Sequence, residues 1–351
     1  MEKKDLKSLN YDQLQQELLA MGEKTFRARQ MYQWFHEKLA DTPQDMSNLP
    51  QALKNRLAQE YVCTDLEILE VLTSATDGTQ KFLFRLADGN VIESVLMRYH
   101  HGNSVCISSQ VGCRMGCRFC ASTLGGLTRN LLPGEMLDQI YKIQKYSNER
   151  VSNLVVMGTG EPLDNYENLL QFIHMLSDEH GLHISQRNIT VSTCGIVPRM
   201  YDLAKEKLQI TLALSLHAST QEKRTKLMPI ALKYELEEVL AACRNYFEKT
   251  GRRLTFEYSL VSNVNDSQED AKRLAALIGK INCHVNLIPV NPIKEREFVQ
   301  PDRRAAEQFR AKLERAGVNA TIRRTLGEDV NASCGQLRKS YMDTQEKKGQ
   351  A

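Results

Sequence analysis

The stretch SVCISSQVGCRMGCRFCAST, residues 104–123, contains four of the nine cysteines of the chain: Cys106, Cys113, Cys117 and Cys120. The last three have the spacing C-x3-C-x2-C. A structural zinc site usually takes four ligands as two separated pairs, and the sequence has no second C-x2-C pair. A [4Fe–4S] cluster normally takes four cysteines, so three leave one iron open to a chelating amine and carboxylate. The triad therefore predicts a catalytic cluster with a co-substrate position, in preference to a zinc site or inert buried cysteines.

The rest of the chain alternates between short apolar runs and stretches of helical periodicity. The runs are rich in β-branched residues and lie at 104–110, 152–158, 188–195, 210–217, 254–261 and 284–291, with a last short strand expected at 321–325. Such alternation predicts an α/β fold with parallel strands and crossover helices, as an open sheet or as a full or partial barrel. Polar residues follow most of the runs, which predicts a site at the C-terminal ends of the strands.

The residues before the triad predict two smaller parts. Residues 1–60 have helical periodicity, with Asn10 as the cap of a first helix and Gly22 at its end. We expect them to form a helical accessory domain. Residues 61–103 alternate apolar and polar side chains around two Asp-Gly pairs, which predicts a β-hairpin linker. The barrel would then span 104–335, and a polar tail 336–351.

The helix expected at 24–39 allows two interpretations. The overlapping segment EKTFRARQMYQWFH, residues 23–36, combines basic and aromatic side chains, as an RNA-binding surface would. An amphipathic helix with a solvated charged face gives the same pattern, and the pattern alone favours this second interpretation.

Composition narrows the class of protein. The chain has 351 residues, of which 42% are apolar and 25% charged, as in a folded soluble protein. An odd number of cysteines, four of them close together, argues against a disulfide framework and for a reducing compartment, the cytoplasm. We expect no signal peptide and no membrane span. The net charge of +3 is too small to indicate a nucleic-acid partner.

The triad, with Phe119 directly before its last cysteine, resembles the radical S-adenosylmethionine (SAM) superfamily. The resemblance implies a partial (β/α)6 barrel in which Cys113, Cys117 and Cys120 hold one [4Fe–4S] cluster. The motif MGTGEPLDN, residues 157–165, resembles the glycine-rich element of that superfamily. By resemblance the SAM pocket is formed by Gly160, Glu161, Ser192, Ser215, Leu216, His217 and Asn291.

Over nearly its whole length the chain is similar to the RlmN/Cfr family of RNA adenine methyltransferases. An electron-poor ring carbon is too weak a nucleophile to take a methyl group directly from SAM. The family mechanism uses a radical route instead and consumes two SAM molecules per turnover. It implies that Cys334 takes a methyl group from the first SAM and that a radical derived from the second activates this group to attack adenine. Cys106 would then attack the Cys334 sulfur, releasing methylated RNA and leaving a Cys106–Cys334 disulfide. Glu93 matches the proposed proton acceptor of the family.

Two branches of this family differ in the carbon that they methylate. The segments GEPL and ASTLGGLTRNL resemble the C2 branch, which implies C2 of adenine in 23S ribosomal RNA and in transfer RNA 3′ of the anticodon. The alternative is the C8 branch, which confers antibiotic resistance. A reducing electron donor of the flavodoxin or ferredoxin type is implied as a partner, and a monomer suffices. A radical enzyme with another substrate and a zinc-containing RNA-binding protein are the competing hypotheses.

Overall fold

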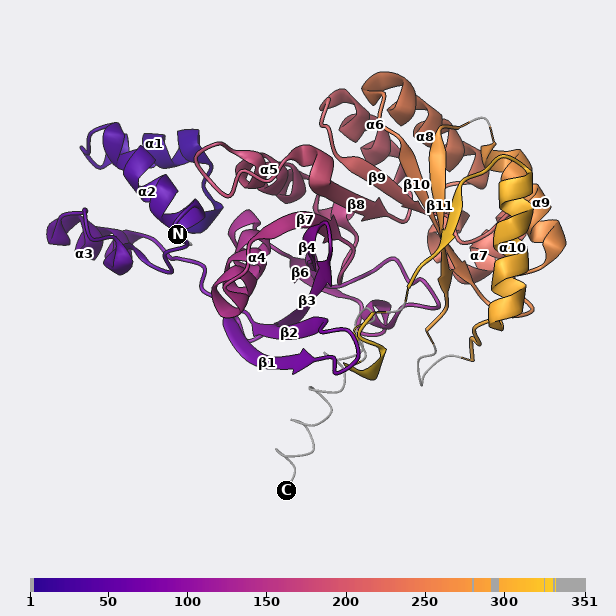
Figure 1. Cartoon of the computed structure of the whole chain (residues 1–351). Helices are drawn as coiled ribbons and strands as arrows, with labels where there is room; N and C mark the ends of the chain where they lie inside the picture. Colours follow the sequence, from indigo (N-terminus) through magenta and orange to yellow (C-terminus); the bar gives the residue numbers. More distant parts are fainter. Residues whose placement is uncertain (1–2, 280, 292–296, 325, 331, 333–351) are drawn as a thin grey trace.

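One mixed sheet of ten strands forms the body of the protein (Figure 1). The computed structural model describes residues 3–279, 281–291, 297–324, 326–330 and 332. The sheet has the order β1-β2-β3-β4-β7-β8-β9-β10-β11-β12. The first four strands pair antiparallel, and from β4 onward every neighbouring pair is parallel. The strands are β1 (Glu67–Thr73), β2 (Gln80–Arg85), β3 (Val91–Tyr99), β4 (Gly102–Cys106), β7 (Val151–Val156), β8 (Ile189–Thr193), β9 (Thr211–Ser215), β10 (Leu254–Leu260), β11 (Cys283–Pro289) and β12 (Ala320–Ile322).

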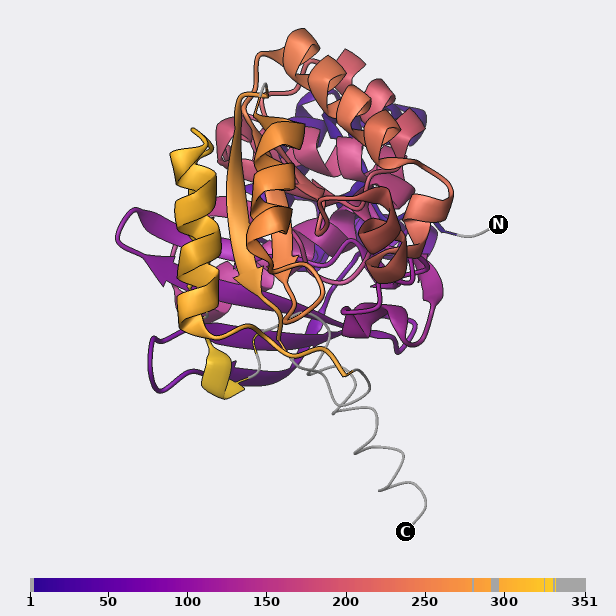
Figure 2. The ribbon, with the colours of Figure 1, turned by 90° about the vertical axis from the view of Figure 1, so that its right-hand side faces the viewer.

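Helices follow the parallel strands and cover their outer face (Figures 1 and 2). Strand β10, with the sequence LTFEYSL, lies in the middle of these parallel strands, and all seven of its residues are buried. This confirms the α/β barrel architecture expected from the alternating sequence. The helices are α4 (Pro133–Ser147), α5 (Tyr166–Ser177), α6 (Val197–Lys205), α7 (Gln221–Leu227), α8 (Leu236–Thr250), α9 (Gln268–Ile278) and α10 (Arg303–Arg315).

The hairpins before the triad belong to the same sheet as the barrel strands. Their turns lie at the two Asp-Gly pairs, where Gly78 and Gly89 have positive φ angles. Strand β3 pairs antiparallel with β4, which in turn pairs parallel with β7. The segment expected as a linker therefore adds antiparallel strands to the edge of the parallel sheet. The boundaries between accessory domain, linker, barrel and tail stay predictions.

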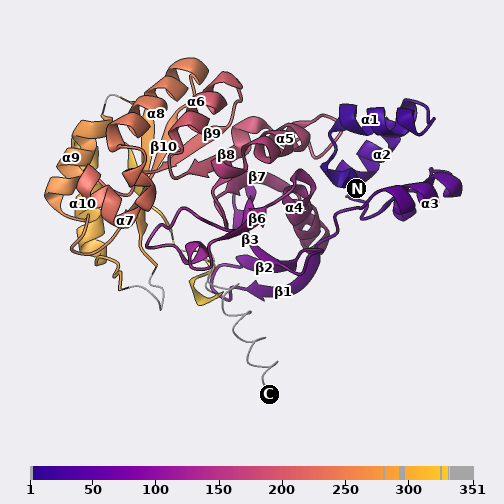
Figure 3. The ribbon, with the colours of Figure 1, turned by 180° about the vertical axis from the view of Figure 1, so that it is seen from behind.

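Three further helices, α1 (Tyr11–Ala20), α2 (Phe26–His36) and α3 (Gln51–Glu60), lie beside α4 and α5 (Figures 1 and 3). Asn10 caps α1 as expected: its side chain accepts a hydrogen bond from the Gln13 amide, and the Gln13 side chain accepts one from Asn10. Helix α2 is shorter than the segment 24–39 predicted for it. None of the described helices is long and apolar enough to span a lipid bilayer.

Two buried polar contacts join the N-terminal region to the barrel. Lys7 forms an ion pair of 2.9 Å with Asp138 of α4, and both side chains are almost fully buried. His36, at the end of α2, lies 2.8 Å from the hydroxyl of Tyr141 of α4. Burial, with the nearby charge of Lys7, lowers the pKa of His36 to about 3. The native protein therefore holds this imidazole neutral.

Acid should weaken the protein through His36. The unfolded chain takes up a proton near pH 6.5, whereas the folded chain does so only near pH 3. The stability that His36 contributes is thus complete above pH 6.5 and is lost as the pH falls from 6.5 towards 3, by about 1.4 kcal/mol per pH unit. His36→Gln should reduce that slope in urea unfolding at pH 7, 6 and 5. The exposed His100→Gln is the control, and equal slopes in both variants would contradict the prediction.

Candidate active site

Two adjoining cavities lie at the C-terminal ends of the parallel strands. The smaller has a volume of about 130 Å³ and the larger of about 250 Å³. The smaller is lined by all three cysteines of the triad and by the segment that follows β7. The larger is lined by Cys106 and by residues from β3, β10, β11 and the end of β12. Six residues line both: Phe119, Cys120, Met157, Ser192, Ser215 and His217.

The loop that carries the triad is closed at its base by a small hairpin. Strands β5 (Gln110–Gly112) and β6 (Leu127–Asn130) pair on either side of it. Gly112 has a φ of +76°, and a Cβ at this position would lie 2.0 Å from the carbonyl oxygen of Gly126. The Cys113 amide donates to the same oxygen at 2.8 Å. The two chain segments can meet so closely only because residue 112 is glycine.

Gly112→Ala should therefore open the base of the loop and prevent loading of the triad. The added methyl group cannot fit, and the positive φ disfavours alanine as well. Gly125→Ala is a matched control in the same loop, since a Cβ there meets no atom within 4 Å. After anaerobic reconstitution, iron content should fall strongly in the first variant and stay at the level of the unaltered protein in the second. Full iron loading of Gly112→Ala would show that the close contact is dispensable.

The three thiols fit a cluster better than a single ion. Within the described ranges, no three Cys, His, Asp or Glu side chains converge on a position that could hold one metal ion. A mononuclear zinc site would bring its sulfurs to about 2.3 Å from a common centre. The cysteines of a [4Fe–4S] cube instead bind separate irons, and so need only line a common cavity. Burial raises the pKa of the Cys113 thiol to about 12, so cluster binding would have to displace a proton there.

The glycine-rich segment after β7 brings backbone against the neighbouring strand end. A Cβ at Gly158 would lie 2.7 Å from the Ile107 carbonyl oxygen, and one at Gly160 2.7 Å from the Gln110 side chain. Glu161 follows and is 4% exposed. Its carboxylate accepts hydrogen bonds from the Cys194 amide at 2.8 Å and the Leu163 amide at 3.1 Å. Burial raises the pKa of Glu161, and these amides oppose the shift.

The remaining residues of the expected SAM pocket come from three strand ends. Ser192 lies in β8 and Ser215 in the neighbouring strand β9, and their hydroxyl oxygens are 3.4 Å apart. His217 accepts a hydrogen bond from the Ser259 amide at its Nδ1, 2.8 Å away, and burial lowers its pKa to about 3. Its ring is therefore neutral with a hydrogen on Nε2. Asn291 lines the larger cavity, whereas Leu216 is fully buried behind the wall.

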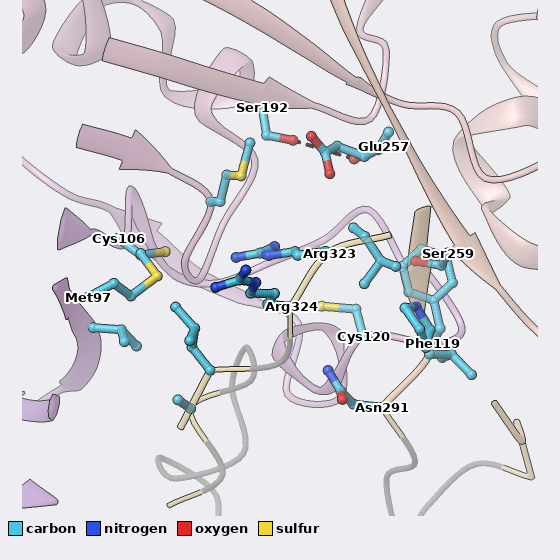
Figure 4. A pocket seen from close by; sticks show the side chains of 18 of the residues that line it. Met97, Cys106, Phe119, Cys120, Ser192, Glu257, Ser259, Asn291, Arg323 and Arg324 are labelled. Atoms are coloured by element: carbon cyan, nitrogen blue, oxygen red, sulfur yellow. Dashed lines mark hydrogen bonds between the residues drawn. The ribbon is translucent and has the colours of Figure 1, made fainter. Parts of the chain in front are cut away.

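Cys106 lies at the end of β4 and lines the larger cavity (Figure 4). Burial raises the pKa of its thiol to about 11, although the positive charge of Arg323 opposes the shift. Glu93 is 3% exposed and does not line either of these two cavities, but its charge also raises the Cys106 pKa. Its carboxylate pairs with the buried Lys81 at 3.1 Å. Cys334, the expected methyl carrier, lies outside the described residues.

Several side chains of the larger cavity escaped the sequence analysis. Arg323 and Arg324 follow β12 and extend into the cavity, and Figure 4 shows their guanidinium groups directed towards the side of Cys106. Glu257 of β10 lines the same cavity, and burial raises its pKa. A carboxylate inside the apolar run LTFEYSL was a usable signal for Glu257. The arginine pair offered only the sequence TIRRT, which equally suits an exposed strand.

Comparison with known proteins identifies the relatives of this chain. Residues 4–63 match the family model of the ribosomal RNA large subunit methyltransferase N-terminal domain, and residues 107–275 that of the radical SAM superfamily. A protein of Lachnospira eligens named "probable dual-specificity RNA methyltransferase RlmN" is 62% identical over 97% of both chains. A protein of the same name from Lachnoclostridium phytofermentans is 60% identical over 97% of this chain and 96% of that one.

A solved structure agrees with these sequence matches. The crystal structure of a radical SAM methyltransferase from Sphaerobacter thermophilus superposes with a TM-score of 0.90 at 41% identity, covering 95% of this chain and 98% of that one. The family model that matches residues 107–275 implies a [4Fe–4S] cluster and SAM, which is the chemistry that the triad loop fits. The chain belongs to the RlmN family of radical SAM proteins.

Proposed function

We propose that this protein methylates C2 of adenine in 23S ribosomal RNA and in transfer RNA 3′ of the anticodon. The observation that carries the proposal is the position of Cys106, a thiol outside the triad that lines the same larger cavity as Cys120. A cavity that could hold a cluster, adjoining a second cavity lined by a separate thiol, suits a reaction in which a cysteine forms a covalent bond to the substrate. The names of the relatives support RNA as the substrate and methyl transfer as the reaction.

Cys113, Cys117 and Cys120 would hold the [4Fe–4S] cluster, which supplies the electron that cleaves SAM to a carbon radical. The smaller cavity would bind the methionine end of SAM through the backbone around Gly160 and through Glu161. Two amide hydrogen bonds fix the direction of the Glu161 carboxylate. Ser192, Ser215 and Asn291 offer hydroxyl and amide groups to the rest of the molecule, and the neutral His217 offers an N–H donor. Two SAM molecules would be consumed per turnover.

Cys334 would carry the methyl group as a thioether, and Cys106 would release the product. In that step the Cys106 sulfur forms a bond to the Cys334 sulfur while the bond from Cys334 to the transferred carbon breaks. The pair of electrons stays with the transferred carbon, which takes up a proton to become the methyl group of the RNA, and a disulfide remains on the protein. The unpaired electron left after the ring proton departs would return to the cluster. The Cys106 proton must leave first, and a pKa of about 11 makes this demanding. The positive charges of Arg323 and Lys81 favour the thiolate, and Glu93 would accept the proton from the adenine ring.

The substrate adenine would have to be unstacked, since a base within a helix cannot reach a cavity at a barrel mouth. Arg323 and Arg324 supply positive charge at that cavity, which suits an RNA ligand. We further propose a flavodoxin or ferredoxin as electron donor, a monomeric state and a cytoplasmic location, where these RNAs are found.

Mass analysis of nucleosides tests the proposal most directly. Reconstituted protein, SAM and a reductant are incubated with unmodified 23S ribosomal RNA or transfer RNA, which is then digested to nucleosides. We expect 2-methyladenosine from both RNAs. Formation of 8-methyladenosine would instead assign the C8 chemistry of the resistance branch, and no methylated adenosine with a fully loaded cluster would overturn the proposal.

A further inference from the structure

Arg224 of α7 is a fully buried arginine with few partners. Its side chain is 0% exposed. One of its nitrogens, Nη2, donates a hydrogen bond to the carbonyl oxygen of Cys194 at 2.7 Å. Its Nε and Nη1 have no hydrogen-bond partner in the described part of the chain. Two of the three nitrogens of a permanently charged group are therefore left unsatisfied in the interior.

No carboxylate balances this charge. Among the described residues, no Asp or Glu oxygen lies within 4.0 Å of the Arg224 guanidinium, although the neighbouring Lys223 pairs with Asp270. Burial accordingly lowers the Arg224 pKa, and the thiol groups of Cys194, Cys117 and Cys243 are the groups whose negative charge would oppose this shift. A buried charge is destabilising unless an opposite charge compensates it. A negative group bound close to Arg224 would remove that penalty.

The guanidinium lies directly behind the wall of the smaller cavity. Cys194 lines that cavity together with Cys113 and Cys117. Its amide donates to Glu161 at 2.8 Å, and its carbonyl accepts from Arg224 at 2.7 Å, so this one residue links the two charged groups. Helix α7 also contacts the triad loop itself, since the Arg118 amide donates to the Leu227 carbonyl at 2.9 Å. Arg224 is thus connected to the triad both through Cys194 and through its own helix α7.

We propose that Arg224 is the buried counter-charge of the cluster and that it raises the reduction potential of the cluster. The inference rests on the proposed function, in which the triad binds a [4Fe–4S] cluster. Three thiolates make that group negative, and reduction adds one more negative charge. A positive charge held in a medium of low polarity stabilises the reduced state more than the oxidised one. Arg224 is thereby a positioning residue, which acts through Cys194 and through its field.

The potential of the cluster tests this directly. Arg224→Gln keeps a hydrogen-bond donor for Cys194 but removes the charge. The midpoint potential of this variant is followed by electron paramagnetic resonance during a redox titration. It should fall by about 59 mV, which corresponds to a change on the order of tenfold in the one-electron reduction equilibrium. Arg224→Lys should restore most of the shift. Lys226→Gln, which removes an exposed charge from the same helix, should leave the potential unchanged.

A fully loaded Arg224→Gln protein with the potential of the unaltered protein would overturn the inference while leaving the proposed function intact. Unaltered protein that binds no iron would instead overturn the proposed function. A second measurement uses the protein without its cluster. The charge is uncompensated there, so Arg224→Met should fold without iron and should gain less thermal stability on cluster loading than the unaltered protein does. An equal gain, or a failure of both the Gln and Met variants to fold without iron, would also count against the counter-charge.

Discussion

Cys106→Ala should stop the reaction after one round and leave RNA covalently attached to the protein. In the proposed reaction the thiol of Cys106 is the group that breaks the bond between Cys334 and the transferred carbon. This thiol lines the larger cavity, and its replacement by a methyl group leaves the cavity open while removing the nucleophile. Denaturing electrophoresis with labelled RNA should show a protein–RNA band in an amount no greater than that of the enzyme.

Two control variants are needed to interpret that experiment. Cys334→Ala should give neither product nor adduct, since it lacks the sulfur to which RNA would be attached, yet it should bind iron normally. Cys283→Ala, at the start of β11 and thus at the opposite end of the strands from the site, should turn over as the unaltered protein does. Repeated turnover by Cys106→Ala without any adduct would remove Cys106 from the mechanism.

Cys117→Ala should abolish iron binding and with it all methylation. A cluster held by three cysteines of one short loop has no spare ligand in that loop, since Cys194, the other thiol that lines the smaller cavity, follows a different strand. Anaerobic reconstitution followed by iron analysis and visible absorption should show a loss of more than tenfold against the unaltered protein. Cys283→Ala again serves as the control. A variant that kept most of its iron and its activity would show that the triad is not the ligand set.

The sequence was most informative where the chemistry is local. The C-x3-C-x2-C spacing lies in one loop, so the pattern of cysteines alone indicated a cluster of irons rather than a zinc ion. Glu161 and Gly160 were likewise predicted from a contiguous motif, and both line the smaller cavity. The short runs rich in β-branched and apolar residues, separated by stretches of helical periodicity, located the parallel strands.

Residues that act from a distance were not accessible in this way. Arg323 reaches the cavity only because β12 pairs with β11 at the far edge of the sheet. Arg224 lies on a helix of seven residues with a mostly charged sequence, QEKRTKL, in which nothing distinguishes this buried charged side chain from the other charged ones. The hairpin β5–β6 was missed because strands of three and four residues leave no periodicity to detect. In each case contacts between residues far apart in the sequence, and not local sequence preferences, determine where the residue or strand lies.

The contact between the Arg118 amide and the Leu227 carbonyl has a consequence for biosynthesis. The triad loop leaves the ribosome well before α7, the helix that supports it, and before β12, which completes the larger cavity. Non-local contacts of this kind form late in folding. During synthesis the three thiols are therefore solvent-exposed and open to oxidants or stray metal ions. If the triad holds a cluster as proposed, iron would have to be delivered to a finished chain, and the thiols would be most open to chemical damage between translation and cluster insertion.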